Sequence, residues 1–396
     1  MPNAVIVDVV RTAGGKRNGK LSGWHPSDLS AATLKALVAR NDLDPALIDD
    51  VIMGCVMQVG SQGLNIGRNA VLAAGFPESV PATTVDRQCG SSQQAVHFAA
   101  QGVMAGAYDI VVAAGVEVMT TTPMGASITP GSFPFGPSVI ARYEATGGLV
   151  PQGISAEMIA DKWAISREDL DEFGARSQRR AAQARDEGRF DNEIVGVDEL
   201  RLDRESGKVT PGDGQVTADE GIREGTTAET LANLKPAFKP DGKVTAGNSS
   251  QISDGASAAL IMSEEKAAEL GLTPRARFVQ FAVVGVDPVT MLTGPIPSTE
   301  KVLARAGLGV ADIDLFEVNE AFASVVLAWE KEIHPDMDRV NVNGGAIALG
   351  HPLGCSGTKL LATLLNELER TGGRFGLQTM CEGGGLANAT IIERLG

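Results

Sequence analysis

The stretch Thr84-Val-Asp-Arg-Gln-Cys89-Gly-Ser-Ser-Gln-Gln-Ala-Val-His-Phe-Ala-Ala100 sets the plan of the chain. A β-branched start leads to a thiol, to small residues and then to apolar residues at helical spacing, which predicts an extended segment, a turn and a helix. Because a helix N-terminus offers free N–H groups and a positive dipole end, we expect an exposed Cys89 thiol with a lowered pKa. Cys89 is therefore a candidate nucleophile, although a free cysteine is more often a small buried apolar residue.

Length, composition and charge indicate a globular protein with an acidic surface. The 396 residues are enough for two or three domains, and a hydrophobic content of 43% is enough for a substantial core. The formal net charge of −15 argues against nucleic acids and anionic membranes as partners, because both are polyanions. We find no apolar run long enough for a transmembrane helix and no signal-peptide pattern at the N-terminus, so a cytoplasmic location is expected.

The four cysteines, Cys55, Cys89, Cys355 and Cys381, do not have the spacing of a disulfide scaffold or of a CxxC motif. Cys55 lies within a predicted strand and is expected in the core. His351 and Cys355 are four residues apart, which is a conceivable metal-ligand spacing, but their glycine-rich surroundings disfavour it. We therefore expect no metal site.

Strands and helices alternate on both sides of a long irregular segment. In the first part they are predicted at 4–10, 27–40, 50–56, 66–74 and 108–115. Residues 120–150 are rich in Thr, Pro, Gly and Ser and show no sustained period, and helices follow at 155–163 and 167–187. The alternation resumes near residue 248 and predicts, beyond 296, a helix at 297–305, a strand at 314–319 and a helix at 320–332.

This pattern predicts an α/β fold built from two halves and an insertion. Residues 1–119 and 248–270 form the first half of the core, 271–396 form the second half, and 120–247 form an inserted loop domain. The second half repeats the plan of 84–115: a glycine-rich turn at 344–358 is followed by a helix at 359–370, a strand at 374–381 and a glycine run. We interpret this as a two-copy duplication, in which each half brings a chemical group to a shared boundary.

Four chemically useful side chains stand at strand ends or turns: Cys89, Asn319, His351 and Cys381. Each also has a purely structural interpretation. Asn319 could cap the following helix, His351 could be a hydrogen-bonded loop residue, and Cys381 could be a core thiol. Their joint occurrence favours a functional site.

A basic cluster in the insertion could receive an anionic ligand, or it could be a solvated surface; it consists of Arg223, Lys235, Lys239 and Lys243.

The chain also resembles a known family through four motifs. Arg87-Gln-Cys-Gly-Ser-Ser, Asn319-Glu-Ala-Phe-Ala, Gly350-His-Pro-Leu-Gly-Cys-Ser-Gly and Cys381-Glu-Gly-Gly-Gly occur together in the order found in thiolases, which are acyl-CoA acyltransferases. The resemblance extends from end to end. It implies the thiolase fold, with two mixed five-stranded α/β halves in five layers, an inserted loop domain and a homodimer or homotetramer. It also implies coenzyme A as a substrate and no permanently bound cofactor.

The same resemblance implies a role for each site residue. Cys89 would form the acyl thioester, His351 would activate Cys89 and donate a hydrogen bond to the thioester oxygen, and Asn319 would hold a water that supplies a second donor. Cys381 would be the general acid and base, with a pKa that needs only modest tuning. The backbone N–H groups of Cys89 and Gly383 would form a second oxyanion hole.

Three further residues are implied to bind the substrate: Arg223 at the nucleotide end of coenzyme A, Ser250 near the pantetheine amide, and Gln152 at the acyl pocket. Thiolases often carry His-Met-Gly or Asn-Met-Gly where this chain has Pro151-Gln-Gly. This departure, and the unusual segment 120–150, favour a degradative 3-ketoacyl-CoA thiolase with a longer, branched or cyclic acyl group. The alternatives are a biosynthetic acetoacetyl-CoA thiolase, a decarboxylating ketoacyl synthase, and a non-catalytic acyl-CoA-binding or scaffold protein.

Overall fold

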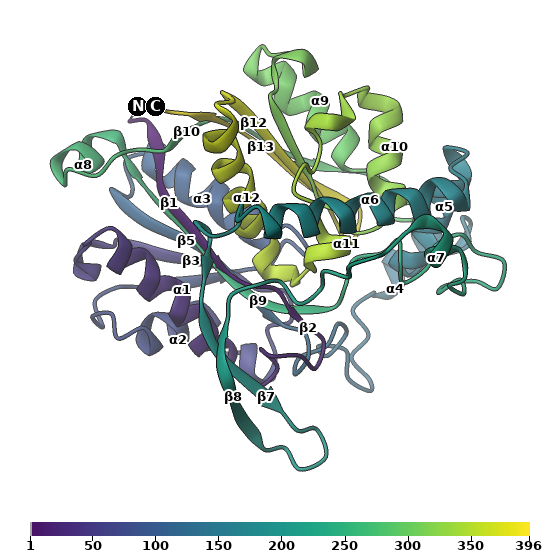
Figure 1. Cartoon of the computed structure of the whole chain (residues 1–396), viewed down its shortest axis with the longest axis horizontal. Coiled ribbons are helices and arrows are strands. Elements are labelled where there is room, and N and C mark those ends of the chain that lie inside the picture. Colours follow the sequence, from purple (N-terminus) through teal and green to yellow (C-terminus); the bar gives the residue numbers. More distant parts are fainter. Residues whose placement is uncertain (1) are drawn as a thin grey trace.

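The computed structural model describes residues 2–396 as two similar α/β halves, with an insertion between two strands of the first half (Figure 1). The first half holds β1 (Ala4–Thr12), β3 (Asp50–Gly54), β4 (Ala82–Val85), β5 (Ile110–Val118) and β9 (Ser253–Ser263). The second half holds β10 (Ala276–Gly285), β11 (Leu315–Val318), β12 (Phe375–Glu382) and β13 (Leu386–Arg394). The strands hydrogen-bond in the order β4-β3-β5-β9-β1 and β11-β12-β13-β10.

The two halves share one topology, which confirms the predicted duplication. β5 is parallel to β3 and antiparallel to β9, and β12 is likewise parallel to β11 and antiparallel to β13. The second half has four strands rather than the five that the resemblance implied. Val340 makes a single parallel bridge to Phe316 of β11, in the place that β4 occupies beside β3. The first strands of the two halves, β1 and β10, meet antiparallel and join the sheets at Val5–Ile6 and Ala276–Arg277.

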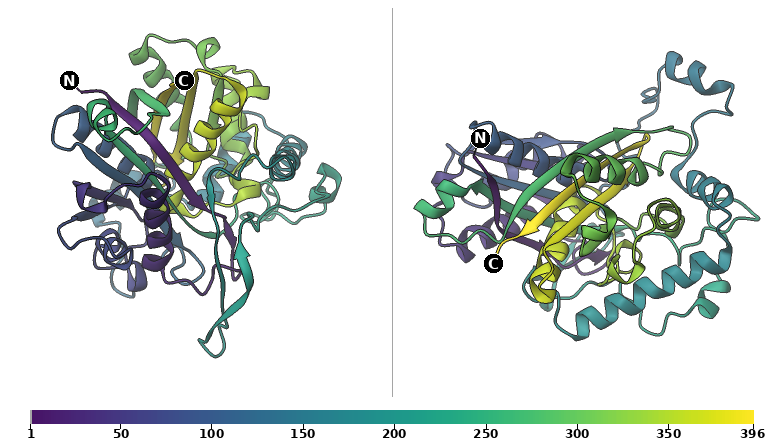
Figure 2. Two further views of the ribbon diagram at one scale, coloured as in Figure 1. Left: turned by 60° about the vertical axis from the view of Figure 1, so that its left-hand side comes forward. Right: turned by 90° about the horizontal axis from the view of Figure 1, so that it is seen from above.

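Helices form the remaining layers (Figure 2). α3 (Ser91–Met104) and α12 (Ser356–Thr371) pack against each other between the two sheets. α1 (Pro26–Arg40) and α2 (Ile66–Ala73) contact the first sheet, and α9 (Pro295–Ala306) packs on the second, where it also contacts α10 (Ala323–Ile333). Polar groups on the central helices are paired across the layers: Gln93 Nε2 donates to Thr390 Oγ1 at 2.8 Å.

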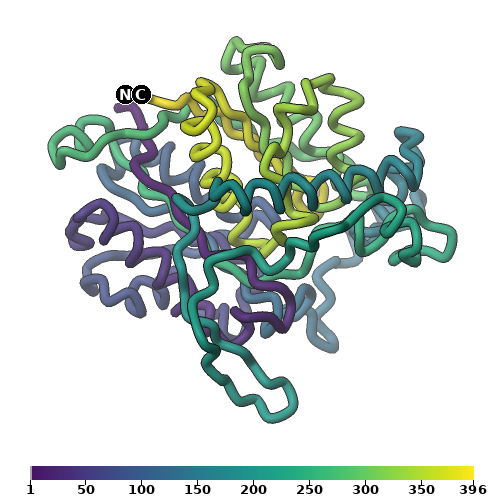
Figure 3. The backbone as a smooth tube through the Cα atoms, in the orientation of Figure 1, coloured from purple at the N-terminus to yellow at the C-terminus, as the bar shows by residue number. Residues whose placement is uncertain are grey.

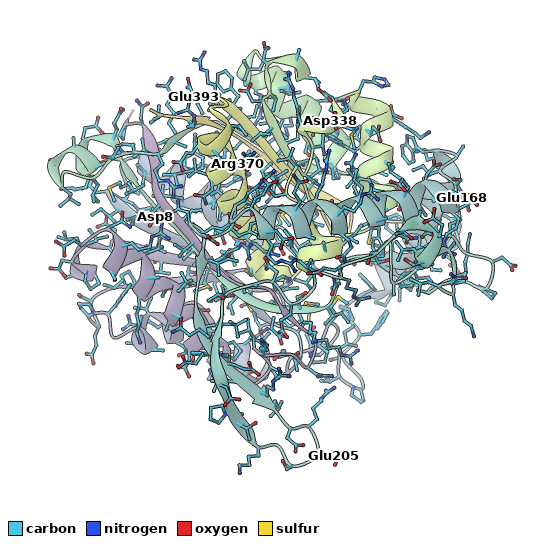
Figure 4. All side chains as sticks on the ribbon, in the orientation of Figure 1. Asp8, Glu168, Glu205, Asp338, Arg370 and Glu393 are labelled. Atoms are coloured by element: carbon cyan, nitrogen blue, oxygen red, sulfur yellow. The ribbon has the colours of Figure 1, made fainter. Side chains whose placement is uncertain are left out.

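The insertion between β5 and β9 wraps over this core (Figures 1 and 3). It contains α4 (Pro137–Glu144), α5 (Gln152–Lys162), α6 (Arg167–Asp186), α7 (Ala228–Ala232), β6 (Ile194–Val195), β7 (Val197–Leu202) and β8 (Val209–Val216). The β7–β8 hairpin projects from the body with Glu205 at its tip (Figure 4). No residue of α4 is buried, so its apolar side chains, among them Val139 and Ile140, do not pack into the core.

Several predicted helix starts differ from those in the structure, for instance at α1, α5 and α10. α1, predicted to begin at residue 27, begins at Pro26, because the His25 ring caps it by accepting from the Ser27 N–H. α5 begins at Gln152 rather than Ser155. α10 begins at Ala323 rather than Glu320, because Phe322 is extended and bridges to Ser249.

Two short elements complete the fold, β2 (Gly15–Lys16) and α8 (Glu264–Glu269). Among residues 2–396, no helix is both long and apolar enough to cross a membrane.

Candidate active site

Cys89 lies in a tight turn that connects β4 to α3. Gln88 has a φ of +47°, an uncommon conformation for a residue with a side chain, and it directs the chain into the helix. The Cys89 side chain packs in an apolar cluster with Val56, Met119, Leu353, Leu360 and Met380, and only 4% of the residue is exposed. The expectation of an exposed thiol was therefore wrong.

The electrostatics of Cys89 also differ from the expectation of a lowered pKa. Burial, followed by the nearby Glu382 carboxyl, raises the pKa of the Cys89 thiol to about 12. Hydrogen bonds from the backbone N–H groups of Gly383 and of Cys89 itself oppose this shift. The thiol is thus protonated at rest, and it needs a base to become a nucleophile.

His351 is oriented by a chain of hydrogen bonds. It follows α11 (Ala346–Leu349), and its Nδ1 lies 2.6 Å from Ser356 Oγ, which itself donates to the Pro352 carbonyl at 2.8 Å. Since the serine proton is used in that bond, Nδ1 is the donor and Nε2 keeps its lone pair. Burial, with Lys359 adding, lowers the pKa of His351 to about 3, so the ring is neutral.

Asn319 belongs to this group and is not a helix cap. It follows β11 directly, and its Nδ2 lies 3.4 Å from His351 Nε2. Behind the pair is a small cavity of about 10 Å³, lined in part by Glu317, Asn319, Ser356 and Lys359. Its size suits a single buried water, and Glu317, Asn319 and Ser356 supply polar groups in its wall.

Cys381 and Gly383 come from the end of β12 and the turn after it. Cys381 is fully buried. Burial, then the charges of Cys89 and Glu382, raise the pKa of the Cys381 thiol well above its usual value, so the expected modest tuning was wrong. A Cβ at Gly383 would lie 3.1 Å from both Gln152 Nε2 and Gln88 Oε1, which places Gln152, at the start of α5, beside this turn.

Two buried charged residues that support the site were missed in the sequence. Glu117 of β5 accepts hydrogen bonds from the backbone of Val56, Met57 and Gly354, and so ties the wall of the Cys89 pocket to the His351 turn. Lys359 Nζ donates to the carbonyls of Leu349 and Gly350, at 2.7 and 3.0 Å, immediately before His351. A charged residue inside an otherwise apolar strand was the available signal for Glu117.

Arg223 lines a pocket of about 120 Å³ together with Gln178, Thr226, Thr230, Gly247, Gln251 and Ile347, among others. This pocket adjoins the site, because the Gln251 carbonyl accepts from the His351 N–H at 3.2 Å and Ile252 packs on the Cys89 cluster. Ser250 precedes Gln251 but does not line the pocket, and its N–H donates to the Ala321 carbonyl.

The predicted basic cluster is divided between two uses. Lys239 and Lys243 both pair with Asp161, at 3.3 and 2.9 Å, and are structural. Arg223 and Lys235 are exposed. Within the cluster, Arg223 and Lys235 are therefore the residues available to bind an anionic ligand.

The conceivable metal pair is also separated. Cys355 Sγ contacts Ser257 Oγ at 3.2 Å, while the His351 ring faces Ser356 and Asn319. Within residues 2–396, no group of three or more His, Cys, Asp or Glu residues has the geometry to hold a metal ion.

Two thiols, a neutral imidazole and backbone N–H groups directed at a sulfur make up a site suited to covalent acyl transfer. Comparison with known proteins agrees: the family described as "Thiolase, N-terminal domain" matches residues 4–265, and "Thiolase, C-terminal domain" matches residues 272–394. The chain belongs to the thiolase family, which confirms the resemblance seen in its motifs.

Individual relatives match over essentially the whole chain. The steroid 3-ketoacyl-CoA thiolase FadA6 of Mycobacterium tuberculosis is 50% identical over 400 residues, which cover 100% of this chain and 95% of that protein. The 3-ketoacyl-CoA thiolase of Saccharophagus degradans is 48% identical, covering 99% and 98%. The crystal structure of the Bacillus anthracis acetyl-CoA acetyltransferase superimposes with a TM-score of 0.89 at 39% identity, covering 100% and 99%.

Proposed function

We propose that this protein is a degradative 3-ketoacyl-CoA thiolase that works through an acyl-enzyme on Cys89. The observation that carries the proposal is the convergence of the two halves. The first half contributes Cys89 and the second contributes His351, Asn319, Cys381 and the N–H of Gly383, which points at the Cys89 sulfur. The relatives named as 3-ketoacyl-CoA thiolases support the degradative direction.

In the first half-reaction, Cys89 sulfur attacks the 3-keto carbon of the substrate while His351 Nε2 takes the thiol proton. The bond between C2 and C3 breaks, and acetyl-CoA leaves as an enolate that takes a proton from Cys381. The raised pKa of Cys381 means that its proton is present for this step. Donors at the enolate oxygen and at the tetrahedral oxyanion come from the His351–Asn319 pair and from the N–H groups of Cys89 and Gly383, each worth about 3–4 kcal/mol in a related case.

In the second half-reaction, the thiol of coenzyme A gives its proton to the Cys381 thiolate and attacks the thioester. The shortened acyl-CoA leaves, and Cys89 sulfur regains its proton from His351. Arg223 in the adjoining pocket would meet the phosphates of coenzyme A, with Ser250 near the pantetheine amide. This assignment gives the acidic chain a local site for an anionic substrate.

We further propose that the acyl group is long, branched or cyclic. The segment 120–247, which we assign as the loop domain, carries a second pocket lined by Phe133, Phe135, Ile140, Tyr143 and Leu149. Most of these side chains are exposed, and such apolar surface usually receives a partner or a ligand. The 50% identical relative is a steroid thiolase, which supports a bulky acyl group.

We propose a homodimer or homotetramer as the working form. β4 is the edge strand of the first sheet and is only half-buried, so its backbone groups are available for a second copy. The molar mass in solution, measured by light scattering, tests this.

Thiolysis rates across a panel of 3-ketoacyl-CoA substrates test the function. We expect turnover of medium-chain, branched or cyclic substrates to exceed that of acetoacetyl-CoA, and we expect Cys89→Ala to abolish all of it. A sole preference for acetoacetyl-CoA would favour the biosynthetic alternative. No thiolysis of any substrate would favour the non-catalytic one.

A further inference from the structure

Glu382 is a fully buried carboxyl group beside the site that the proposed mechanism does not use. It follows Cys381 at the end of β12, so the two side chains leave opposite faces of the strand. Both carboxyl oxygens are buried, and neither has a hydrogen-bond partner within residues 2–396. Because an unpaired buried carboxyl group is costly, a functional reason for its presence should be sought.

The Glu382 carboxyl lies against the start of α3. A Cβ at Gly90 would collide with Glu382 Oε1 and would lie 2.9 Å from Asn388 Nδ2. Gly90 is the N-cap residue of α3, and no side chain caps this helix. Cys89 is the residue just before Gly90. The catalytic thiol and the carboxyl group therefore share one helix N-terminus and its positive end.

The charged groups around this N-terminus come from several elements. The turn before Cys89 contributes Asp86 and Arg87, and the Arg87 Nε is itself buried without a partner among the described residues. β12 contributes Cys381, and β5 contributes Glu117, whose charge also acts on Cys89. His351 is neutral.

These surroundings favour a neutral Glu382. Burial raises the pKa of the carboxyl well above its usual value, Asp86 adds to the shift, and Arg87 opposes it. Once ionised, the carboxylate would raise the pKa of both Cys89 and Cys381.

We propose that Glu382 is a positioning residue that acts across Gly90 and the start of α3: while neutral it leaves the positive end of the helix to the Cys89 sulfur, and once ionised it opposes formation of the Cys89 thiolate. This inference rests on the proposed role of Cys89. As the pH rises, Glu382 ionises at the shared N-terminus. Its carboxylate then interacts with the positive end of α3, so that the helix stabilises the Cys89 thiolate less. Glu382 exchanges no proton with the substrate.

The test is the pH profile of Cys89 alkylation by iodoacetamide, followed by mass spectrometry of the Cys89 peptide. It is measured in a Cys381→Ala background, so that the second thiol does not contribute, with and without Glu382→Gln. The glutamine keeps the shape and removes the charge. We expect the midpoint to fall by about one pH unit, so that alkylation at a given alkaline pH is about tenfold faster. Glu300→Gln, on the exposed face of α9, is the matched control and should leave the profile unchanged.

An unchanged midpoint of the alkylation profile in Glu382→Gln would overturn the proposal. This holds even if the absolute alkylation rate falls, because a purely structural role of Glu382 would lower the rate without moving the midpoint. If Glu382→Gln does not fold, the shape of the Cys381→Ala profile decides. If the Cys89 ionisation is coupled to that of Glu382, the alkylation rate should rise with pH more gradually than for a single ionisation. A profile that fits a single ionisation would contradict the proposal.

An acyl adduct on Cys89 in the unmodified enzyme is recorded in the same preparation. Its absence would count against the proposed function, whereas an unchanged alkylation profile counts against the role of Glu382 alone.

Discussion

His351 Nε2 lies 3.4 Å from the side-chain nitrogen of Asn319, and both side chains are almost completely buried. The ring is fixed from its other side, because Nδ1 donates to Ser356 Oγ at 2.6 Å. The proposed base, His351, is therefore set in one tautomer before any substrate arrives. This preorganisation is built by one turn, since His351 and Ser356 are five residues apart.

Ser356→Ala should release this tautomer. We expect kcat to fall by about 10- to 100-fold with little change in KM, because general base catalysis contributes about 10²–10⁴-fold and the ring would keep its place but lose its orientation. Steady-state thiolysis kinetics measure both constants. Ser22→Ala is the control. It removes a buried serine hydroxyl that donates to the Gly19 carbonyl, and because Ser22 is far from His351 along the chain, it should leave kcat unchanged. Equal effects of the two variants would contradict the role of Ser356.

Lys359→Met should destabilise the fold by about 2–4 kcal/mol, because the carbonyls of Leu349 and Gly350 lose a buried charged donor. Urea unfolding measures this loss.

The difference in stability between the wild type and Lys359→Met should also depend on pH. Burial lowers the pKa of Lys359 from 10.5 to about 8, so between these values the folded state binds fewer protons than the unfolded state. The contribution of Lys359 to the free energy of unfolding therefore rises with pH across that window. The stability difference between the wild type and Lys359→Met should grow from pH 8 upward. A difference that shrinks or stays constant would show that the ammonium group is not desolvated in the folded protein.

Gly90→Ala should be harmful because its Cβ would collide with the Glu382 carboxyl. We expect a loss of about 1–3 kcal/mol, measured by thermal unfolding, and a large loss of Cys89 acylation. Adding Glu382→Ala should restore much of the stability, since it removes the atoms that collide. Gly214→Ala, where nothing lies within 4 Å of the new Cβ, is the control. Failure of the second substitution to restore stability would mean that Asn388 Nδ2, 2.9 Å from the new Cβ, and not Glu382 excludes a side chain at position 90.

Gln152→Met should change acyl preference while leaving acylation of Cys89 intact. The Gln152 amide lies beside Gly383, and replacing it with a thioether removes a polar group next to the proposed acyl position. We expect the ratio of kcat/KM for a medium-chain over an acetoacetyl substrate to rise by about fivefold, which corresponds to about 1 kcal/mol. If the ratio is unchanged, Gln152 does not line the acyl pocket.

The sequence predicted the architecture well because the buried strands are near-continuous apolar runs. The order of chemical group, central helix and strand also repeats visibly in the two halves. The exact ends of the helices were harder to predict. α10 starts three residues late because Phe322 pairs with Ser249, a contact made across more than 70 positions of the chain.

The pKa shifts of the site could not be predicted from the sequence either, because they also depend on residues that are distant along the chain. Cys89 is buried by Met119, Leu353, Leu360 and Met380, and its pKa is raised further by Glu382 from the other half. The local feature, a helix N-terminus that lowers a thiol pKa, is present but is outweighed by these distant groups. Likewise, only the fold reveals that Asp161 pairs with both Lys239 and Lys243.

In the proposed mechanism, Cys89 carries the acyl group between the two half-reactions. Intact-protein and peptide mass spectrometry after brief exposure to a 3-ketoacyl-CoA, without free coenzyme A, tests it most directly. We expect one added acyl group on the Cys89 peptide, absent in Cys89→Ala and discharged when coenzyme A is added. An unmodified Cys89 in a preparation that still cleaves the substrate, or an adduct on another residue, would contradict it.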